Sequence, residues 1–382
     1  MATPDQSRRD FIKTTGAAVL AAAAGAGAPT TQLAPPDAQP PNLKVPKPKT
    51  NTVGYAIVGL GTLALNQILP AFKTSKLCRP VALVSGHLEK ARQVADVYGI
   101  DPKAIYSYDN YERMADNKDI NAVYVVLPNS MHAEYTIRAA KAGKHVLCEK
   151  PMAANVAECQ QMIDACRAAQ KKLMVAYRLH YEPYNRTAIE MCRRKEFGDL
   201  RFIESTNAQN TRAPNIRLSK KLAGGPLQDI GVYCINACRY LSGEEPVEVT
   251  GQIFQPSDDP NFAEVPRDVM WTMSFPGGIS AHCGISFNSG GSRRYRVHGT
   301  GGWLDLEKAF DYSGQELRTN KGQLTTKHDL PYIDHFAAEM DHFAECVMQN
   351  KDPVTPGEEG LADMKVIAAI EEAARTGRRV KV

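Results

Sequence analysis

Two glycines and an alanine follow an apolar run in a spacing that suits phosphate binding. Gly59, Gly61 and Ala64 form the pattern GxGxxA between an apolar run at residues 53–58 and a helix-like run at residues 65–72. The first two positions let the backbone approach a pyrophosphate, and the third lets the helix pack closely on the strand. A strand, turn and helix without a ligand is the alternative. We predict a dinucleotide site formed by Gly59, Gly61, Thr62 and Leu63.

The tip of the next expected strand carries Ser85, where a fold that prefers NAD usually carries Asp or Glu for the ribose 2′-hydroxyl. The cation Lys90 follows, with Arg92 close by. A hydroxyl donor and a cation favour a 2′-phosphate, which a carboxylate would repel. Ser85 and Lys90 therefore predict NADP, unless Ser85 only ends a strand and Lys90 is a solvated helix residue.

The N-terminus resembles an export leader. Arg8 and Arg9 precede an Ala/Gly-rich run at residues 16–28, which is too short and too weakly apolar to span a bilayer. We predict a twin-arginine signal peptide at residues 1–28, a Pro-rich arm or linker at residues 29–52, and delivery to the periplasm. A disordered N-terminus with Arg-Arg by chance is the alternative.

Charge and cysteine usage exclude several classes of protein. The formal net charge of +4 is dispersed, which argues against nucleic-acid binding and against stable membrane association. The nine cysteines are an odd number without paired spacing, which argues against a disulfide framework. Cys234 and Cys238 lie one helical turn apart without a second ligand pair, so we predict no metal site.

Residues 53–175 alternate between apolar strands and helices. Strands are expected at residues 53–58, 80–84, 122–127, 145–148 and 173–177, and helices at residues 65–72, 89–98 and 133–142. This alternation predicts an α/β Rossmann domain with a parallel, doubly wound sheet.

Residues 176–382 have a different pattern. Residues 269–275 and 279–287 alternate with period two around a Pro-Gly-Gly turn, and further strands are expected at residues 202–208, 247–254, 294–298 and 303–306. We predict an α+β domain with a large, mostly antiparallel, open sheet whose face could support a homo-oligomer. Helices at residues 333–348 and 360–376 are expected to pack back on the first domain.

Three motifs follow the fingerprint in order: Leu127-Pro128-Asn129 with His132, then Glu149-Lys150-Pro151, then Asp229-Ile230-Gly231-Val232-Tyr233. This series resembles the Gfo/Idh/MocA oxidoreductase family over the chain from residue 53 onward. Tyr233, where many members carry His, and the run Tyr177 to Pro183 are similar to the glucose–fructose and aldose–aldose oxidoreductase branch.

The resemblance implies that Lys150, Asp229 and Tyr233 face a nicotinamide ring and act on a sugar hydroxyl. One group must serve as base and then as acid, and an ammonium beside a phenol favours the phenolate. Lys150 beside Tyr233 would supply that ammonium. The alternatives are a surface lysine, an Asp229 that caps the following helix, and a structural hydrogen bond between Asp229 and Tyr233 on one helix face.

Further contacts are expected around this centre. The resemblance assigns the cofactor contacts Leu127, Pro128, Asn129, His132, Glu149, Lys150 and Arg178. Arg178, His180 and Tyr181 lie in a polar loop at the end of a strand, a position suited to the sugar. Alternatively, Tyr181 belongs to the core and His180 is exposed. His335 and His342 are expected at the surface.

These observations predict an oxidoreductase with tightly bound NADP(H) that oxidises an aldose to its lactone and reduces a second sugar to the alditol. Free NADP should be scarce outside the cytoplasm, which favours internal recycling of the cofactor. The first alternative is an NADP-dependent aldose dehydrogenase with exchangeable cofactor. The second is a non-catalytic protein that binds sugar or nucleotide.

Overall fold

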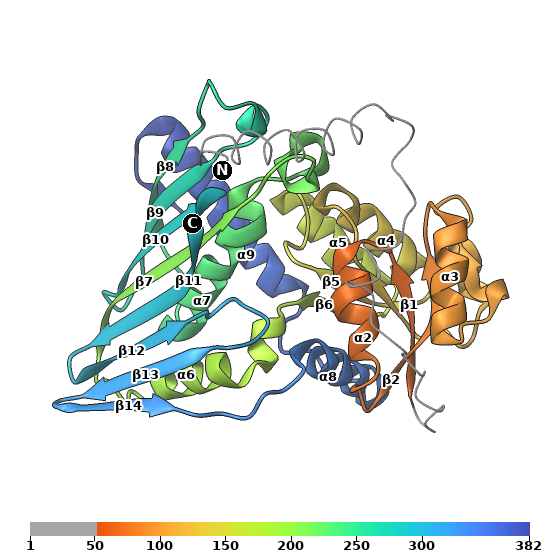
Figure 1. Cartoon of the computed structure of the whole chain (residues 1–382), viewed down its shortest axis with the longest axis horizontal. Coiled ribbons are helices and arrows are strands. Elements are labelled where there is room, and N and C mark those ends of the chain that lie inside the picture. Colours follow the sequence, from red (N-terminus) through yellow and green to blue (C-terminus); the bar gives the residue numbers. More distant parts are fainter. Residues whose placement is uncertain (1–51) are drawn as a thin grey trace, which may run out of the picture. The chain divides into compact units, whose positions relative to one another are not determined.

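The computed structural model describes residues 52–382, and these contain two sheets (Figure 1). The predicted leader, and the predicted arm apart from Thr52, lie outside the described residues. All described residues belong to one compact unit, so the division after residue 175 stays a prediction.

The first sheet is fully parallel, with the strand order β3-β2-β1-β4-β5-β6. All six residues of β1 are buried, as expected for a central strand with helices on both faces. The strands are β1 (Val53–Val58), β2 (Cys78–Val84), β3 (Ile105–Tyr106), β4 (Ala122–Val125), β5 (His145–Glu149) and β6 (Leu173–Ala176).

The crossovers of this sheet are mostly helical. The segment expected as a helix at residues 65–72 begins as a π-helical turn, η2 (Ala64–Ile68), and ends as α2 (Leu69–Ala71). The remaining crossover helices are α3 (Leu88–Tyr98), α4 (His132–Lys141) and α5 (Val156–Ala168). This right-handed succession of strand and helix brings the carboxyl ends of β1, β4 and β5 to one edge of the sheet.

The second sheet has nine strands in the order β14-β13-β12-β11-β7-β10-β9-β8-β15 and is antiparallel except for the pair β7 and β10. The predicted mostly antiparallel sheet is confirmed. Its strands are β7 (Leu200–Asn210), β8 (Glu248–Phe254), β9 (Asp268–Ser274), β10 (Ser280–Ser286), β11 (Asn288–Gly299), β12 (Gly302–Glu307), β13 (Glu316–Lys321), β14 (Leu324–His328) and β15 (Val380–Lys381).

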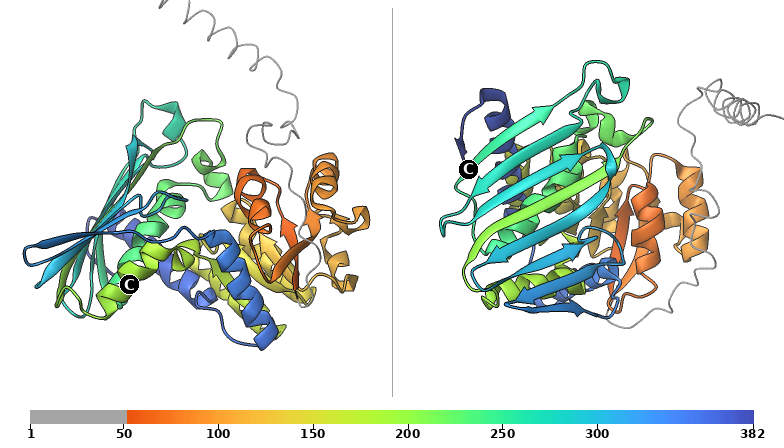
Figure 2. Two further views of the ribbon diagram at one scale, coloured as in Figure 1. Left: turned by 60° about the horizontal axis from the view of Figure 1, so that its bottom comes forward. Right: turned by 60° about the vertical axis from the view of Figure 1, so that its left-hand side comes forward.

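Helices cover one face of this sheet and leave the other open (Figure 2). The helices of this part are α6 (Pro183–Arg193), α7 (Val232–Ser242), α8 (His335–Gln349) and α9 (Gly357–Thr376). Helix α9 packs on β8 of this sheet and on β6 of the parallel sheet, whereas α8 packs on the parallel sheet, where the Tyr55 hydroxyl on β1 donates to the Met340 carbonyl oxygen at 3.0 Å. The two sheets therefore share a helical layer.

Three classes of feature are absent from residues 52–382. No helix there is long and apolar enough to cross a membrane. No cluster of three or more His, Cys, Asp or Glu side chains in this part of the chain could hold a metal ion. All nine cysteines are buried, and none forms a disulfide.

Candidate active site

The glycine turn after β1 has the shape of a phosphate cradle. Gly59 has φ +95°, and a Cβ there would lie 2.3 Å from the Val126 carbonyl oxygen. At Gly61 a Cβ would meet no atom within 4 Å, so this side of the turn is open. Thr62 is exposed and Leu63 is half-buried where the helical segment begins. The turn therefore fits a dinucleotide pyrophosphate, which needs close approach of the backbone.

Lys90, which follows β2, is available to bind a ribose phosphate. Ser85 is buried, and its Oγ accepts a hydrogen bond from the His87 backbone N–H at 3.1 Å. Arg92 is exposed and pairs with Glu89 at 3.3 Å, whereas no ion pair among residues 52–382 includes Lys90. Burial lowers the pKa of half-buried Lys90, as expected for an ammonium that lacks a counter-ion. Lys90 is therefore better placed than Arg92 to bind a 2′-phosphate.

The loops after β4 and β5 are joined by a buried histidine. His132 is fully buried, with Nδ1 2.8 Å from the Pro151 carbonyl oxygen and Nε2 2.9 Å from the Leu127 carbonyl oxygen. Burial lowers the pKa of His132, although these carbonyls oppose the shift. A neutral imidazole donates from only one nitrogen, so one of the two contacts is not a hydrogen bond. His132 therefore connects the two loops. Leu127 and Pro128, which belong to the loop after β4, are half-buried.

The structure brings together the three residues expected to perform the chemistry. Lys150 Nζ donates to the Asp229 backbone oxygen at 2.8 Å and lies 3.7 Å from its Oδ1. The same ammonium lies 4.4 Å from the centre of the Tyr233 ring. Lys150 follows β5, whereas Asp229 lies in the π-helical turn η9 (Leu227–Gly231) that precedes α7. The cluster thus joins the parallel sheet to the second part of the chain.

Acidic neighbours keep Lys150 protonated. Burial works to lower the pKa of Lys150, but the neighbouring Tyr233, Asp229 and Glu149 outweigh it and raise the pKa. Glu149 is buried and accepts from the Tyr124 hydroxyl at 2.9 Å. Its carboxylate therefore faces the core beside Lys150, and its predicted cofactor contact stays a prediction.

Arg178 is the second cation beside Tyr233. It is buried, and Nη2 lies 3.5 Å from the Tyr233 hydroxyl and 2.7 Å from the Phe310 carbonyl oxygen. Burial opposes its charge, but Tyr233 and Tyr312 contribute to raising the pKa of Arg178. Its guanidinium carbon also lies 4.7 Å from the centre of the Tyr312 ring. Arg178 therefore contacts the side chains of both Tyr233 and Tyr312.

Two residues that hold Asp229 were not predicted from the sequence. Arg217 Nε donates to Asp229 Oδ2 at 2.7 Å, and Gln209 Nε2 lies 3.4 Å from the same oxygen. The carboxylate is thus shared between Lys150 and Arg217 and does not cap the following helix. Arg217 lies in the short 3-10 turn η7 (Ile216–Leu218), whose three residues are too few to give a periodic signal in the sequence.

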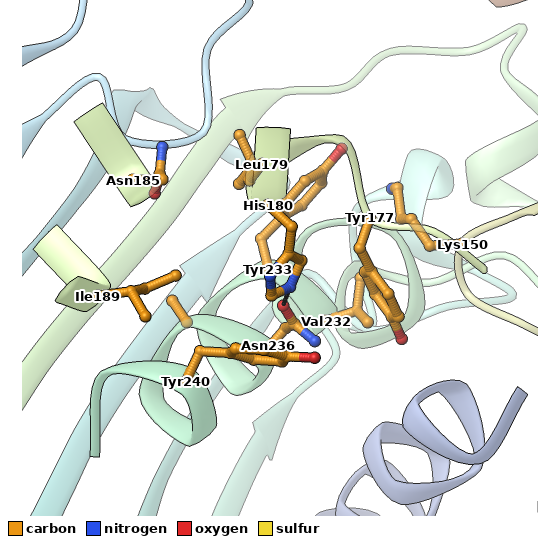
Figure 3. Close-up of a pocket in the computed structure, with 11 residues that line it drawn as sticks. Lys150, Tyr177, Leu179, His180, Asn185, Ile189, Val232, Tyr233, Asn236 and Tyr240 are labelled. Carbon is orange, nitrogen blue, oxygen red and sulfur yellow. Dashed lines mark hydrogen bonds between the residues drawn. The ribbon is translucent and has the colours of Figure 1, made fainter. Parts of the chain in front are cut away.

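A small pocket opens beside Lys150 and Tyr233 (Figure 3). His180 lies at its wall, with Nε2 donating to Asn236 Oδ1 at 2.9 Å and its ring 3.9 Å from that of Tyr240. Burial lowers the pKa of His180 to about 4, so the ring is neutral near pH 7. The lining residues are Lys150, Tyr177, Leu179, His180, Asn185, Ile189, Val232, Tyr233, Asn236, Ala237 and Tyr240.

One expected position is wrong, and one predicted sugar contact stays a prediction. Tyr181 does not line this pocket, and its hydroxyl lies 3.9 Å from Met174 Sδ. The surface position expected for His335 is wrong: the residue is 1% exposed, and Nδ1 lies 3.4 Å from Arg178 Nη1. Because His335 begins α8 on the side facing Arg178, it packs inward. His342 is half-buried and accepts from the Val354 N–H at 3.1 Å.

The arrangement suits transfer of a proton to or from a hydroxyl group. Lys150 has a side chain that is only 12% exposed, which excludes a solvated surface lysine. A phenol between Lys150 and Arg178 can act as base and acid, while Lys150 can orient the reacting oxygen. The glycine turn follows β1 and Lys150 follows β5, so both lie at the carboxyl ends of parallel strands, where nucleotides bind in such folds.

Two family models match most of the described chain. The oxidoreductase family with an NAD-binding Rossmann fold matches residues 53–177. The Gfo/Idh/MocA C-terminal domain matches residues 185–305.

Individual proteins are similar over nearly the same length. NADP-dependent D-xylose 1-dehydrogenases from Haloarcula marismortui and Haloferax volcanii are 32% and 30% identical, over 87% and 86% of this chain and 94% and 99% of those proteins. The crystal structure of aldose–aldose oxidoreductase from Caulobacter crescentus in complex with glycerol has a TM-score of 0.85 and 40% identity. It covers 87% of this chain and 100% of that chain.

Proposed function

The chain belongs to the Gfo/Idh/MocA oxidoreductase family, and from this premise we propose that it is an aldose–aldose or glucose–fructose type oxidoreductase with non-dissociating NADP(H). It oxidises an aldose to its lactone and reduces a second sugar to the alditol in a ping-pong cycle. The observation that carries this proposal is the cluster of Lys150, Asp229 and Tyr233. The 40% identity to an aldose–aldose oxidoreductase supports the substrate class.

The residues have distinct tasks in the two halves of the cycle. In the first half, Tyr233 removes the proton from the C1 hydroxyl as the hydride leaves C1. In the second half, the same phenol returns the proton to the carbonyl oxygen of the second sugar. Lys150 donates to the reacting oxygen, and Asp229 holds Lys150 in place through the contacts at 2.8 and 3.7 Å. The proton and the hydride that leave the first sugar both reach the second.

The nucleotide, when bound, accepts the hydride from the first sugar and supplies it to the second. Gly59, Gly61, Ser85 and Lys90 would hold its phosphates and ribose. We propose that it remains bound between the two halves, because a twin-arginine leader would carry the enzyme away from the cytoplasmic NADP pool. A retained cofactor needs no second enzyme for its regeneration.

A second candidate is an NADP-dependent aldose dehydrogenase that exchanges its cofactor in each turnover. The two D-xylose 1-dehydrogenases, at 32% and 30% identity, favour it. Both candidates use the same Lys150 and Tyr233 chemistry and differ only in cofactor release.

The test uses protein purified without added nucleotide. It is incubated with D-xylose or D-glucose alone, and aldonic acid and alditol are quantified, with the Tyr233→Phe variant as the inactive control. Equal amounts of acid and alditol over many turnovers support the closed cycle. Product that forms only with added NADP, in step with NADPH, supports the dehydrogenase. No product under either condition supports the non-catalytic alternative.

Export to the periplasm belongs to the same proposal. Arg8 and Arg9 are the residues that a twin-arginine translocase would require. A variant with both changed to lysine keeps the charge of the leader but should stay in the cytoplasm. Cell fractionation of both forms tests this, and equal periplasmic amounts would contradict the assignment.

Self-association through the open face of the nine-stranded sheet is the last part of the proposal. Met270 on β9 is 63% exposed and Phe202 on β7 is 37% exposed, although both belong to strands whose alternate residues are buried. Exposed apolar residues on a sheet face favour burial against a second copy. Sedimentation of the wild type and Met270→Lys tests this, and an identical mass for the two would contradict it.

A further inference from the structure

The connection between β7 and α7 folds back on itself beside the candidate active site. We name residues 211–225 the strap; it is the green segment after β7 in Figure 1. It starts where the Thr211 N–H donates to the Phe287 carbonyl oxygen at 2.7 Å and ends where the Gly225 carbonyl accepts from Asp229 N–H at 3.0 Å. The strap therefore leads directly into the turn that carries Asp229.

The strap touches the loop that follows β4, which belongs to the other sheet. Asn129 Nδ2 donates to the Ala223 carbonyl oxygen at 2.8 Å. Asn129 lies in a loop expected to contact the cofactor. This hydrogen bond joins the strap to the loop after β4.

Arg217 fixes the shape of the strap. Its carbonyl oxygen accepts from the Gly225 N–H at 2.9 Å, while its Nε donates to Asp229 Oδ2 at 2.7 Å. At Gly224 a Cβ would lie 2.4 Å from the same carbonyl oxygen, so the strap packs tightly on Arg217. Arg217 thus holds the C-terminal end of the strap and the Asp229 carboxylate.

We propose that Arg217 is a positioning residue that retains the nucleotide, because its ion pair with Asp229 keeps the strap closed against Asn129. The inference rests on the proposed function, which requires a cofactor that stays bound. A nucleotide lying between the loops after β1 and β4 would have to pass the contact between Asn129 and Ala223 to leave. Without the guanidinium, the strap loses its ion pair with η9, and the contact between Asn129 and Ala223 opens more often.

The ion pair between Arg217 and Asp229 also links retention of the nucleotide to the catalytic lysine. Asp229 divides its carboxylate between Lys150 at 3.7 Å and Arg217 at 2.7 Å. Loss of Arg217 leaves Lys150 as the main partner of Asp229 and removes a positive charge from its surroundings. The strap and the catalytic lysine therefore respond to the same substitution.

The experiment measures nucleotide that remains with the purified protein during timed dialysis, by chromatography of the denatured sample. We compare wild type, Arg217→Gln, Arg217→Lys and the control Lys221→Gln. Lys221 is an exposed cation of the same strap, so its change removes the same charge without touching Asp229. We expect release about tenfold faster in Arg217→Gln, because a charge-assisted hydrogen bond is lost. Arg217→Lys should restore part of the retention, and Lys221→Gln should match wild type.

A double-mutant cycle separates this role from a general loss of stability. If Arg217 acts through Asp229, then Asp229→Asn combined with Arg217→Gln releases nucleotide no faster than the faster single variant. Equal retention in wild type and Arg217→Gln would overturn the inference and leave the proposed function standing. Rapid loss of nucleotide from the wild type would instead overturn the proposed retention. Equal acceleration in Arg217→Gln and Lys221→Gln would mean that net charge matters and Arg217 has no special role.

Discussion

Lys150 Nζ lies over the face of the Tyr233 ring, 4.4 Å from its centre, and directs a hydrogen bond to the Asp229 backbone oxygen at 2.8 Å. The Tyr233 hydroxyl instead has Arg178 Nη2 beside it at 3.5 Å. The phenol is thus held between two cations, of which only Arg178 reaches its oxygen. Lys150 remains able to donate to a sugar oxygen placed next to Tyr233.

Replacing Tyr233 with Phe should remove the acid and base but leave the nucleotide site intact. Because general acid–base catalysis contributes about 100-fold to 10,000-fold, sugar turnover should fall by at least about 100-fold. Nucleotide content, measured after denaturation, should stay at the wild-type level. Tyr312→Phe is the matched control, since it removes a phenol on the other side of Arg178. Turnover near wild type in Tyr233→Phe would contradict the assignment.

An added methyl group should reduce nucleotide binding at Gly61 and folding stability at Gly59. Gly61→Ala meets no protein atom within 4 Å, so stability without nucleotide should change by less than about 1 kcal/mol, while nucleotide content falls sharply. Gly59→Ala places a Cβ 2.3 Å from the Val126 oxygen at φ +95°, which should cost at least about 1–3 kcal/mol of stability. Urea unfolding and nucleotide analysis of both variants test this. Full nucleotide content in Gly61→Ala would contradict the cradle.

Lys90 should select NADP over NAD. Lys90→Gln removes the half-buried cation, and we expect affinity for NADP to fall about tenfold while affinity for NAD stays constant. Arg92→Gln is the matched control, because Arg92 is exposed and already paired with Glu89 at 3.3 Å. Isothermal titration of nucleotide-free protein with each dinucleotide gives the comparison. Equal losses for NADP and NAD would show that Lys90 does not contact the 2′-phosphate.

The sequence indicates the fold wherever burial leaves a periodic pattern. Strand β1 is an unbroken apolar run because both of its faces are covered, and β9 alternates because only one face is covered. Strand β14 (Leu324–His328) was not predicted, since four of its five residues are exposed and its sequence, LTTKH, has no apolar period. Exposed edge strands carry little of the signal on which such predictions depend.

The candidate site was predictable only where motifs mark it. Lys150 and Asp229 are 79 positions apart, and family resemblance, not spacing, placed them together. Arg217 lies in the three-residue 3-10 turn η7, so its contact with Asp229 follows only from the tertiary fold. His335 was expected at the surface because a surface position explained a histidine on this helix more simply than a role as a ligand. Tertiary packing against Arg178 buries it instead.

The buried His335 makes stability depend on pH. Burial, and then the charge of Arg178, lower the pKa of His335 to about 3. An unfolded histidine has a pKa of about 6.5, so the unfolded chain binds a proton at pH 5 while the native ring does not. This residue therefore contributes stability that is present above about pH 6.5 and is lost as the pH falls.

His335→Gln should reduce the loss of stability on acidification, because glutamine does not titrate. Between pH 7 and pH 5 the histidine costs the wild type about 2 kcal/mol, a value set by the unfolded pKa as long as the native ring stays neutral. The free energy of unfolding from urea titrations at both pH values should therefore fall by about 2 kcal/mol less in the variant than in the wild type. His282→Gln is the matched control, since His282 is exposed on the open face of the second sheet. Equal pH dependence in the wild type and His335→Gln would mean that the native ring binds its proton as readily as the unfolded chain does.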